Sequence, residues 1–335
     1  MRTGRILVTG GAGFVGSHIA IGLAERESHS QVMAFDDLSR PGSERNVARL
    51  ERAGVTFVRG DLHEKGELLA IDRIDALVEC SAESSSLMSV YHCLELVRRD
   101  NAQIVFLSTS RVYPLRHLLA IELEETDTRF EIASEQKLPG VSPAGISEEF
   151  PLWGVRTQSG AGRLAGEHLI GDYVEGYGVR GVINRFGVIA GPWSAGVFAR
   201  WVAAHYFKQP LAYTGFGGSG KQVRDVVHVD DVVELVAAQL AFPDEWSGHV
   251  ANAGGGRNVS LSLRETTELC SQITGNRLDL SRSSAELPDE VPIYISDCSL
   301  LFERSDWRPT RDARAILTDI FEWIRANETE ARAAL

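Results

Sequence analysis

The chain has 335 residues, a length that allows two domains or one large α/β domain with an appended lobe. With 44% hydrophobic and 24% charged residues, its composition is that of an ordinary globular protein, which excludes a disordered, collagenous or coiled-coil chain. The net charge of −12 argues against a surface that binds nucleic acid or anionic membranes, although a local basic pocket for an anionic substrate stays possible.

Cysteine and histidine spacing gives no sign of a metal site. The four cysteines, Cys80, Cys93, Cys270 and Cys298, form no C-x-x-C pair, so neither a zinc site nor a disulfide framework is predicted. The sequence also shows no apolar run long enough for a signal peptide or a membrane span. We therefore expect a soluble protein of the cytoplasm with no resident metal.

Short apolar runs alternate with amphipathic stretches in the first third of the chain, a pattern typical of strands and crossover helices. Each crossover is long enough for the right-handed connection that parallel strands need. The pattern predicts a doubly wound parallel sheet. The predicted strands are Arg5–Thr9, Gln31–Phe35, Val55–Val58, Ala76–Glu79 and Ile104–Ser108, and the predicted helices are Phe14–Arg26, Glu44–Arg52, Glu64–Ala70 and Leu87–Arg99.

The periodicity fails over residues 113–153, a proline-rich and acidic segment that we expect to be an irregular, functional insertion. Regularity returns with a predicted helix at Ala161–Tyr177 and a predicted strand at Gly181–Arg185. We therefore expect a first domain over residues 1–185 and a smaller C-terminal lobe over residues 186–335. The predicted helices of the lobe are Val197–Phe207, Asp230–Leu240, Ser262–Thr274 and Arg311–Arg325.

Three glycines lie between the first predicted strand and the first predicted helix. Gly10 permits a tight turn, Gly13 lets backbone N–H groups approach a pyrophosphate, and Gly16 allows close packing of helix on strand. Asp36 follows about 20 residues later at the end of the second strand, where a carboxylate binds the adenosine ribose and repels a 2′-phosphate. The pattern predicts a Rossmann-type dinucleotide site that prefers NAD over NADP. Because Arg40 is a cation close to Asp36 in sequence, NADP stays an alternative cofactor.

This glycine spacing, together with the residues 36–42 (Asp-Asp-Leu-Ser-Arg-Pro-Gly), resembles the extended short-chain dehydrogenase/reductase family. Within it, the chain is most similar to the branch of NAD-dependent nucleotide-sugar epimerases and dehydratases. Further matches lie at residues 60–62, 107–113, 184–187 and 220–228, and the last of these resembles relatives of CDP-tyvelose 2-epimerase. The resemblance covers essentially the whole chain. It implies an α/β Rossmann-type fold with a substrate-binding lobe, an isomerase-like activity on a nucleotide sugar, and NAD as cofactor.

The resemblance also implies roles for individual residues. Thr109 matches an active-site hydroxyl that hydrogen-bonds the substrate oxygen, although such a hydroxyl at a strand end can also simply cap the backbone. Arg224 matches a diphosphate ligand, with an ion pair to a nearby aspartate as the alternative, and Asn184 and Arg185 are assigned to substrate binding. A homodimer through the helices at 87–99 and 161–177 is expected. The residues expected around the cofactor are Gly10, Gly13, Phe14, Val15, Gly16, Asp36, Asp37, Ser39, Arg40, Asp61, Leu62, Ser81 and Ser108.

The catalytic pair is where the chain departs from the family. Family members carry Tyr-x-x-x-Lys at the helix predicted at 161–177, and the register of residues 163–168 places Ser159 at the tyrosine and Arg163 at the lysine. A serine hydroxyl needs a separate base, and an arginine stays protonated. The usual hydride-transfer machinery is therefore altered at both positions.

A second departure follows the fourth strand, where the family reads apolar-His-apolar-Ala-Ala-Gln and then a long loop. Here residues 79–86 read Glu-Cys-Ser-Ala-Glu-Ser-Ser-Ser and the next helix comes early. Cys80 and Glu83 are candidates for a replacement base at this strand end, with a solvated or capping carboxylate as the plainer reading of Glu83. Two hypotheses remain: an enzyme with a remodelled site, or a catalytically inactive homologue that binds the cofactor or a partner protein.

Overall fold

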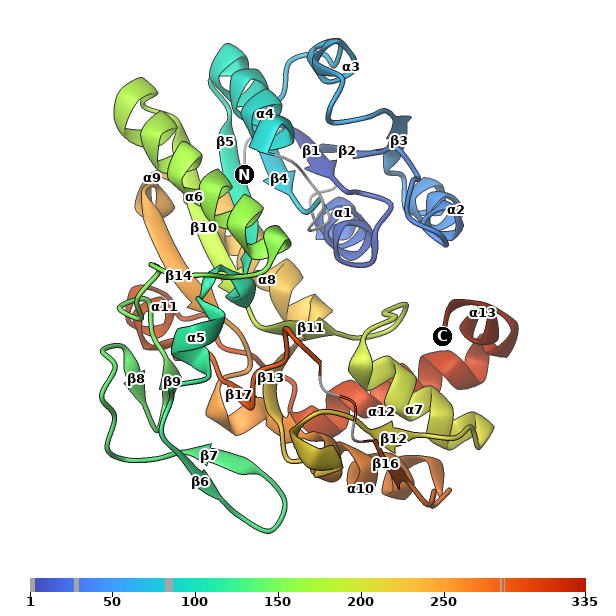
Figure 1. Cartoon of the computed structure of the whole chain (residues 1–335). Coiled ribbons are helices and arrows are strands. Elements are labelled where there is room, and N and C mark those ends of the chain that lie inside the picture. The colour runs from blue at the N-terminus through green and yellow to red at the C-terminus, as the bar shows by residue number, and fades with distance from the viewer. Residues whose placement is uncertain (1–3, 27–29, 82–86, 284, 286) are drawn as a thin grey trace. The chain divides into compact units, whose positions relative to one another are not determined.

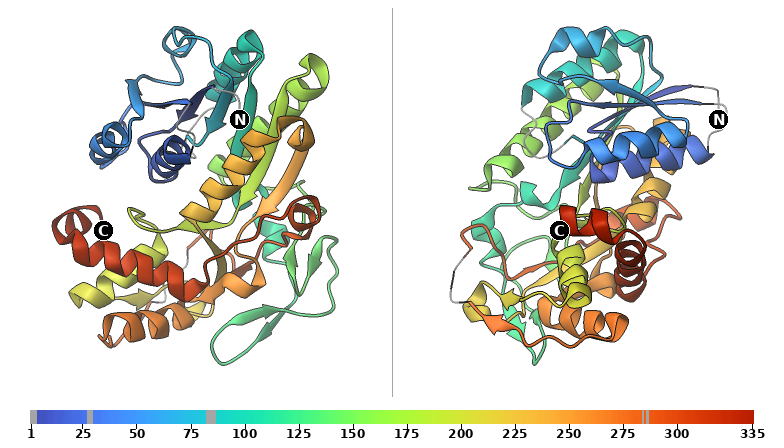
Figure 2. Two further views of the ribbon diagram at one scale, coloured as in Figure 1. Left: turned by 180° about the vertical axis from the view of Figure 1, so that it is seen from behind. Right: turned by 90° about the vertical axis from the view of Figure 1, so that its right-hand side faces the viewer.

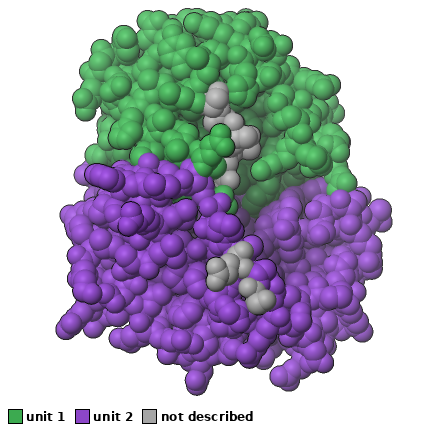
Figure 3. Space-filling view, viewed as in Figure 1, with its two compact units in different colours: residues 1–112, 158–185, 232–251 green, residues 113–157, 186–231, 252–335 purple. Residues whose placement is uncertain are grey.

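The structure is a computed structural model that describes residues 4–26, 30–81, 87–283, 285 and 287–335. By compactness the chain divides into two units, coloured separately in Figure 3. Unit 1 comprises residues 1–112, 158–185 and 232–251, and unit 2 comprises residues 113–157, 186–231 and 252–335. The units are interleaved along the chain, and the linear division into domains at residues 185 and 186 stays a prediction.

Unit 1 is built on a seven-stranded sheet with the strand order β14-β10-β5-β4-β1-β2-β3. The four neighbouring strand pairs from β5 to β3 are all parallel, so the predicted doubly wound sheet is confirmed. The chain runs outward from β1 in one direction and then from β4 in the other, which makes the β1/β4 junction the switch point of the sheet. The strands are β1 (Arg5–Thr9), β2 (Gln31–Asp36), β3 (Thr56–Arg59), β4 (Ala76–Glu79), β5 (Gln103–Thr109), β10 (Arg180–Phe186) and β14 (His249–Ala253).

Helices cover both faces of this sheet (Figures 1 and 2). One face carries α1 (Phe14–Arg26), α2 (Glu44–Arg52) and α8 (Val229–Ala241), and the other carries α3 (Lys65–Leu69), α4 (Leu87–Asp100) and α6 (Gln158–Tyr177). Under α4 and α6 lies an apolar core that includes Leu77, Val90, Ile104, Phe106 and Ile170. Burial on both faces explains why the strands read as continuous apolar runs.

Unit 2 has a smaller four-stranded sheet of β11 (Val188–Ala190), β13 (Val223–His228), β15 (Ser260–Ser262) and β17 (Ile293–Tyr294). Helices α7 (Val197–Phe207), α10 (Leu263–Thr274) and α12 (Ala313–Ala326) pack against one another around a core that includes Trp201 and Ile320. The side chain of Ser262 accepts a hydrogen bond from the backbone of Glu265, and this cap starts α10. Unit 2 also contains α11 (Ser299–Arg304), α13 (Glu328–Ala334) and the pair β12 (Ala212–Tyr213) and β16 (Ser281–Arg282), whereas α9 (Pro243–Trp246) belongs to unit 1.

The segment predicted to be irregular contains short regular elements, so that prediction is wrong in part. It folds into α5 (Leu115–Leu118) and two hairpins, β6 (Leu123–Glu125) with β7 (Phe130–Ile132), and β8 (Val141–Ser142) with β9 (Gly145–Ile146). Strands of two or three residues show no readable period, which is why the sequence pattern missed them. Within unit 2, Lys221 Nζ lies 2.8 Å from Glu125 Oε1 and Arg129 donates to Ser260 Oγ at 2.7 Å, so the first hairpin is fastened.

Among the described residues, none of the helices combines the length and the apolar character that crossing a membrane needs.

Candidate functional site

The turn between β1 and α1 is shaped by backbone sterics. Gly10 has a φ of +61°, in the left-handed region, and its carbonyl accepts a hydrogen bond from Gly13 N at 3.0 Å. A Cβ atom on Gly16 would lie 2.2 Å from Gly10 O, so only glycine fits where α1 begins against the turn. The start of α1 therefore sits directly on a tight turn with no side chain at these glycines, which leaves room for an anionic group.

Two polar side chains hold this turn in place. Asp36, the last residue of β2, accepts hydrogen bonds from Ala12 N at 3.0 Å and Leu38 N at 2.9 Å. Burial raises the pKa of the Asp36 carboxyl, and these hydrogen bonds oppose the rise. On α2, the buried Asn46 donates from Nδ2 to Ala12 O at 2.8 Å. The sequence reading missed Asn46, whose only signal is a polar residue on the inner side of an otherwise charged helix.

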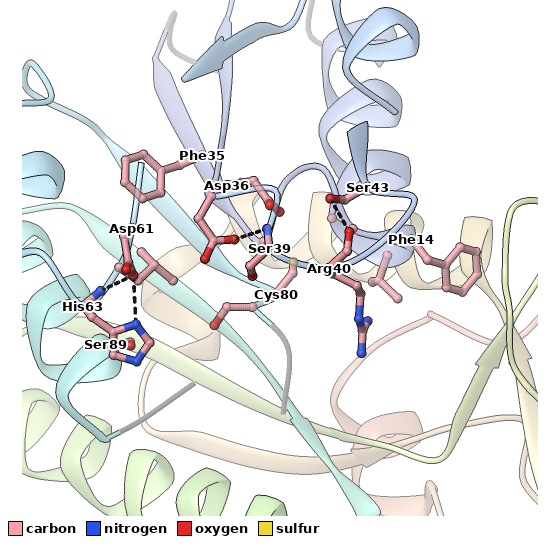
Figure 4. A pocket seen from close by; sticks show the side chains of 17 residues that line it. Phe14, Phe35, Asp36, Ser39, Arg40, Ser43, Asp61, His63, Cys80 and Ser89 are labelled. Atoms are coloured by element: carbon pink, nitrogen blue, oxygen red, sulfur yellow. Dashed lines mark hydrogen bonds and ion pairs between the residues drawn. The ribbon is translucent and has the colours of Figure 1, made fainter. Parts of the chain in front are cut away.

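A pocket of about 230 Å³ opens beside the turn, at the carboxyl ends of β1, β2 and β4 (Figure 4). In open α/β sheets this switch point is where ligands bind. The structure brings together here the predicted Gly10, Gly13, Phe14, Val15, Gly16, Asp36, Asp37, Ser39, Arg40, Asp61, Leu62, Cys80 and Ser81. The pocket is also lined by four residues that the sequence did not predict, Phe35, Ser43, His63 and Ser89. Two of them, Ser43 and His63, lie in loops only a few residues after predicted ones.

One corner of the pocket holds a paired Asp61 and His63. Both the backbone N and the Nδ1 of His63 lie 2.8 Å from Asp61 Oδ1. These hydrogen bonds lower the pKa of the Asp61 carboxyl, so it is ionised at neutral pH. In Figure 4 this pair faces the pocket from one side, while Arg40 and Phe14 lie on the other.

The wall formed by the segment after β4 contains a buried ion pair. Glu79, which is 1% exposed, accepts from Ser81 N at 3.1 Å and from the Ser81 hydroxyl through Oε1, and pairs with Arg163 through Oε2. Arg163 of α6 also donates to the Ser81 carbonyl, and its guanidinium lies 4.8 Å from the centre of the Phe106 ring. The residue at the expected lysine position is thus bound inside the protein, and it is not among the described residues that line the pocket.

Cys80 and Glu83 are the two candidates for a replacement base, and the structure describes only Cys80. Burial, reinforced by the neighbouring Glu79, raises the pKa of the Cys80 thiol well above its usual value. A protonated thiol at neutral pH is neither a base nor a nucleophile, so we do not propose Cys80 in either role. Glu83 lies outside the described residues.

The other predicted active-site hydroxyls lie near α6. Thr109 ends β5, and its Oγ1 accepts from Arg111 N at 3.3 Å. Ser159 lies in the first turn of α6, and its buried Oγ has no hydrogen-bond partner among the described residues. Ser108 donates to Glu167 Oε1 at 2.5 Å. None of these three residues is among the described residues that line the pocket.

The predicted substrate-binding residues have protein partners. Asn184 is fully buried and exchanges two hydrogen bonds of 2.8 Å with Gln239. Arg185 is buried and pairs with Glu167, 2.7 Å from Oε2. Both side chains are engaged inside the protein, and their assignment to substrate binding stays a prediction. In unit 2, Arg224 forms an ion pair of 3.3 Å with Glu290.

The glycine turn, the acidic residue at the end of β2 and the sheet's switch point place this chain among dinucleotide-binding folds, and sequence comparison names the family. A sequence model described as the NAD dependent epimerase/dehydratase family matches residues 6–254. The chain belongs to this family. The predicted family and its NAD dependence are thereby confirmed at the level of the family.

The names of individual relatives specify different nucleotide sugars as their substrates. This chain is 25% identical to a CDP-paratose 2-epimerase of Salmonella typhi, over 95% of this chain and 98% of the relative. It is 28% identical to a dTDP-glucose 4,6-dehydratase of Mycolicibacterium smegmatis, over 97% and 94% of the two chains. Among solved structures, the UDP-glucuronic acid 4-epimerase of Bacillus cereus, in complex with UDP-glucuronic acid and NAD, aligns with a TM-score of 0.77 at 22% identity, covering 96% and 99% of the two chains. That structural likeness confirms the fold.

Proposed function

We propose that this protein binds NAD in the pocket beside the β1–α1 turn and acts on a nucleotide sugar with a remodelled catalytic site. The observation that carries the proposal is the gathering of the glycine turn and Asp36 around one cavity at the sheet's switch point. The glycines fit the group, because a Cβ at Gly10 or Gly16 would collide with backbone atoms, so the chain keeps these two positions free of side chains.

Each part of the pocket suits one part of the dinucleotide. Gly10, Gly13 and the start of α1 would hold the pyrophosphate, and the Asp36 carboxylate would accept the ribose hydroxyls. Asp61 and Leu62, farther along the pocket wall, would border the adenine. When bound, NAD supplies a hydride acceptor.

The chemistry proposed for the substrate end differs from that of a tyrosine base. Thr109 keeps a hydroxyl at the end of β5 that can hydrogen-bond a substrate oxygen, and Ser159 offers a second hydroxyl on α6. A serine hydroxyl has no usable basicity of its own, so proton removal needs another group. The names of the relatives support a nucleotide sugar as substrate.

One observation favours a second candidate, a catalytically inactive homologue that binds cofactor or a partner protein. Arg163 is held by Glu79 and Ser81, so its guanidinium is committed to the protein interior. Without the phenol and the mobile ammonium, acid–base catalysis of the usual kind is lost, which typically costs about 10²–10⁴ in rate.

Two measurements made in sequence separate the two candidates. NAD binding is measured by titration calorimetry, and the purified protein is then mixed with CDP-, dTDP- and UDP-hexoses while the absorbance of NADH and the sugar products are followed. Transient NADH with a changed sugar supports the enzyme. NAD binding without turnover supports the inactive homologue, and absence of NAD binding overturns the proposed function.

We also propose a homodimer that pairs through α4 and α6. The two helices pack side by side on one face of unit 1, and their apolar residues Leu87, Met88 and Tyr177 are 47%, 54% and 63% exposed. Two-fold pairing is the commonest soluble assembly. Light scattering at micromolar concentration is expected to give twice the chain mass, and a monomer mass would contradict the dimer.

A further inference from the structure

The segment after β4 touches the glycine turn directly. A Cβ atom on Gly10 would lie 2.7 Å from both Cys80 O and Ser81 Cα, and 2.8 Å from Ser81 N. The backbone of these two residues therefore packs against Gly10 as closely as a glycine allows. Any shift of residues 80 and 81 changes the pocket next to the turn, because all three residues line it.

The position of Ser81 is set by the buried ion pair. Its N–H and its hydroxyl both donate to Glu79 Oε1, and its carbonyl accepts from Arg163. Arg163 closes the cluster by donating to Glu79 Oε2. Every polar atom of Ser81 is thus bound to one of two charged side chains that are 1% and 6% exposed.

Arginine suits this position in a way that lysine does not. A guanidinium donates from two nitrogens in a fixed plane, so that it can reach a carboxylate and a carbonyl together, and its face can stack on an aromatic ring. Here Nη1 faces Glu79, Nη2 faces Ser81, and the ring of Phe106 lies beneath. A lysine ammonium is a point charge without this planar fork.

We propose that Glu79 and Arg163 are a positioning pair that fixes the wall of residues 80 and 81 against the glycine turn and so sets the affinity for NAD. Arg163, which aligns with the family's lysine, then acts on cofactor binding through the protein wall that it holds. This inference rests on the proposed NAD site and concerns how that site is built.

Because the two residues carry opposite charges, losing one is expected to change NAD affinity by a different amount from losing the other. Removing the arginine leaves Glu79 as an uncompensated buried anion beside a wall that touches the pyrophosphate turn, whereas neutralising Glu79 leaves a cation there. Removing both leaves no charge at the position of this pair. Loss of Arg163 is therefore expected to weaken NAD binding more than loss of the Glu79 charge, and the double variant is expected to bind better than the arginine variant alone.

The test compares the wild type with Glu79→Gln, Arg163→Met, Arg163→Lys and the double variant Glu79→Gln with Arg163→Met. Titration calorimetry gives Kd for NAD, and thermal unfolding gives the stability of each protein. We expect Kd to rise about tenfold or more in Arg163→Met and about threefold in Glu79→Gln. We expect the double variant to recover part of the loss and Arg163→Lys to fall between the wild type and Arg163→Met.

Ile170→Ala is the matched control, because Ile170 is a buried residue of the same helix, α6, and makes no part of the pocket lining among the described residues. It is expected to lower the melting temperature while leaving Kd for NAD within about threefold of the wild type. If Arg163→Met fails to fold, Arg163→Lys and the double variant still test whether the pair sets NAD affinity, because each must then differ from the wild type in Kd.

The outcomes are distinct. If the wild type does not bind NAD, the proposed function and this inference both fall. If the wild type binds NAD and the folded arginine variants bind it equally well, or if Ile170→Ala weakens binding as much as they do, the positioning pair is wrong and the proposed function stands. A double variant that binds worse than either single variant also overturns the pair, since independent losses add.

Discussion

The two walls of the pocket in unit 1 are built on different principles. The wall after β1 depends on missing side chains: Gly10 and Gly16 let backbone approach backbone. The wall after β4 depends on charged side chains, with Glu79 and Arg163 holding Ser81 from both sides. A wall made by glycine sterics tolerates little sequence change, whereas a wall made by side chains can be rebuilt with a new set of partners. The first wall is therefore the part of the pocket whose sequence is the more tightly constrained.

The largest effect is expected from breaking the first wall. In Gly16→Ala the new methyl group would lie 2.2 Å from Gly10 O, so the turn must shift. We expect Kd for NAD to rise at least about 100-fold in titration calorimetry. Gly66→Ala is the control, because a Cβ at Gly66 would meet no described atom within 4 Å beyond its chain neighbours and the backbone of its own helix. NAD affinity within threefold of the wild type in Gly16→Ala would show that the turn is not a binding wall.

In the second wall, Arg163 compensates the buried charge of Glu79. Asp225 in unit 2 is a second buried carboxyl group with which this compensation can be compared. Asp225 is fully buried; its Oδ2 accepts a hydrogen bond from Gly256 N at 3.3 Å, and its Oδ1 has no hydrogen-bond partner among the described residues. Burial raises its pKa to about 6, so native Asp225 binds a proton in a pH range where the unfolded chain releases it. Stability is then greatest below about pH 4 for this group and falls as pH rises to about 6.

Asp225→Asn removes this titration. The variant is expected to gain stability relative to the wild type as pH rises from 4 to 7, by on the order of 2–3 kcal/mol, since each pKa unit is worth about 1.4 kcal/mol. Denaturant unfolding of both proteins across this pH range measures the difference. A difference that does not change with pH would mean that Asp225 is ionised throughout.

A smaller effect is expected at Asp36, the residue beside the first wall that is proposed to bind the adenosine ribose. Asp36→Asn keeps one acceptor for the two N–H groups of Ala12 and Leu38 and removes the charge that repels a 2′-phosphate. We expect NAD binding to weaken about tenfold and the preference for NAD over NADP to shrink, as measured by parallel titrations. The exposed Asp72→Asn serves as the charge control. An unchanged ratio of the two affinities would remove Asp36 from the choice of cofactor.

The smallest effect is expected at Cys80. Its thiol is protonated at neutral pH, so Cys80→Ser should leave any turnover of a nucleotide sugar within about twofold of the wild type. Steady-state rates across neutral pH provide the measurement. A large loss of rate in Cys80→Ser, together with a wild-type rate that rises at high pH while the rate of the variant does not, would restore Cys80 as a base.

The parts of the molecule that could be predicted are those whose signal is local in sequence. The glycines and Asp36 lie within one strand–helix–strand stretch, and their chemistry depends on backbone geometry that the spacing specifies. The strands and helices of unit 1 follow from apolar periodicity, with α6 starting three residues early because Gln158, Ser159 and Gly160 carry no apolar signal.

Long-range pairs could not be predicted. Glu79 and Arg163 are 84 residues apart, and nothing near either residue shows that the other neutralises it. The same holds for Asn46 and Ala12, 34 residues apart, whose hydrogen bond depends on how α2 docks on the turn. Arg163 alone was predicted at the position of the catalytic lysine, and only the packed sheet shows that it pairs inside the protein with Glu79.

The interleaving of the two units has a consequence for how the chain acquires its structure. Strand β14 completes the seven-stranded sheet beside β10, yet it is synthesised some 60 residues later, after much of unit 2. A nascent chain that ends at Arg185 exposes β10 as an unpaired edge, and contacts of such long sequence separation form slowly. Refolding is therefore expected to pass through a stage in which the β10 edge is open to pairing with other chains, so yield should fall steeply with protein concentration.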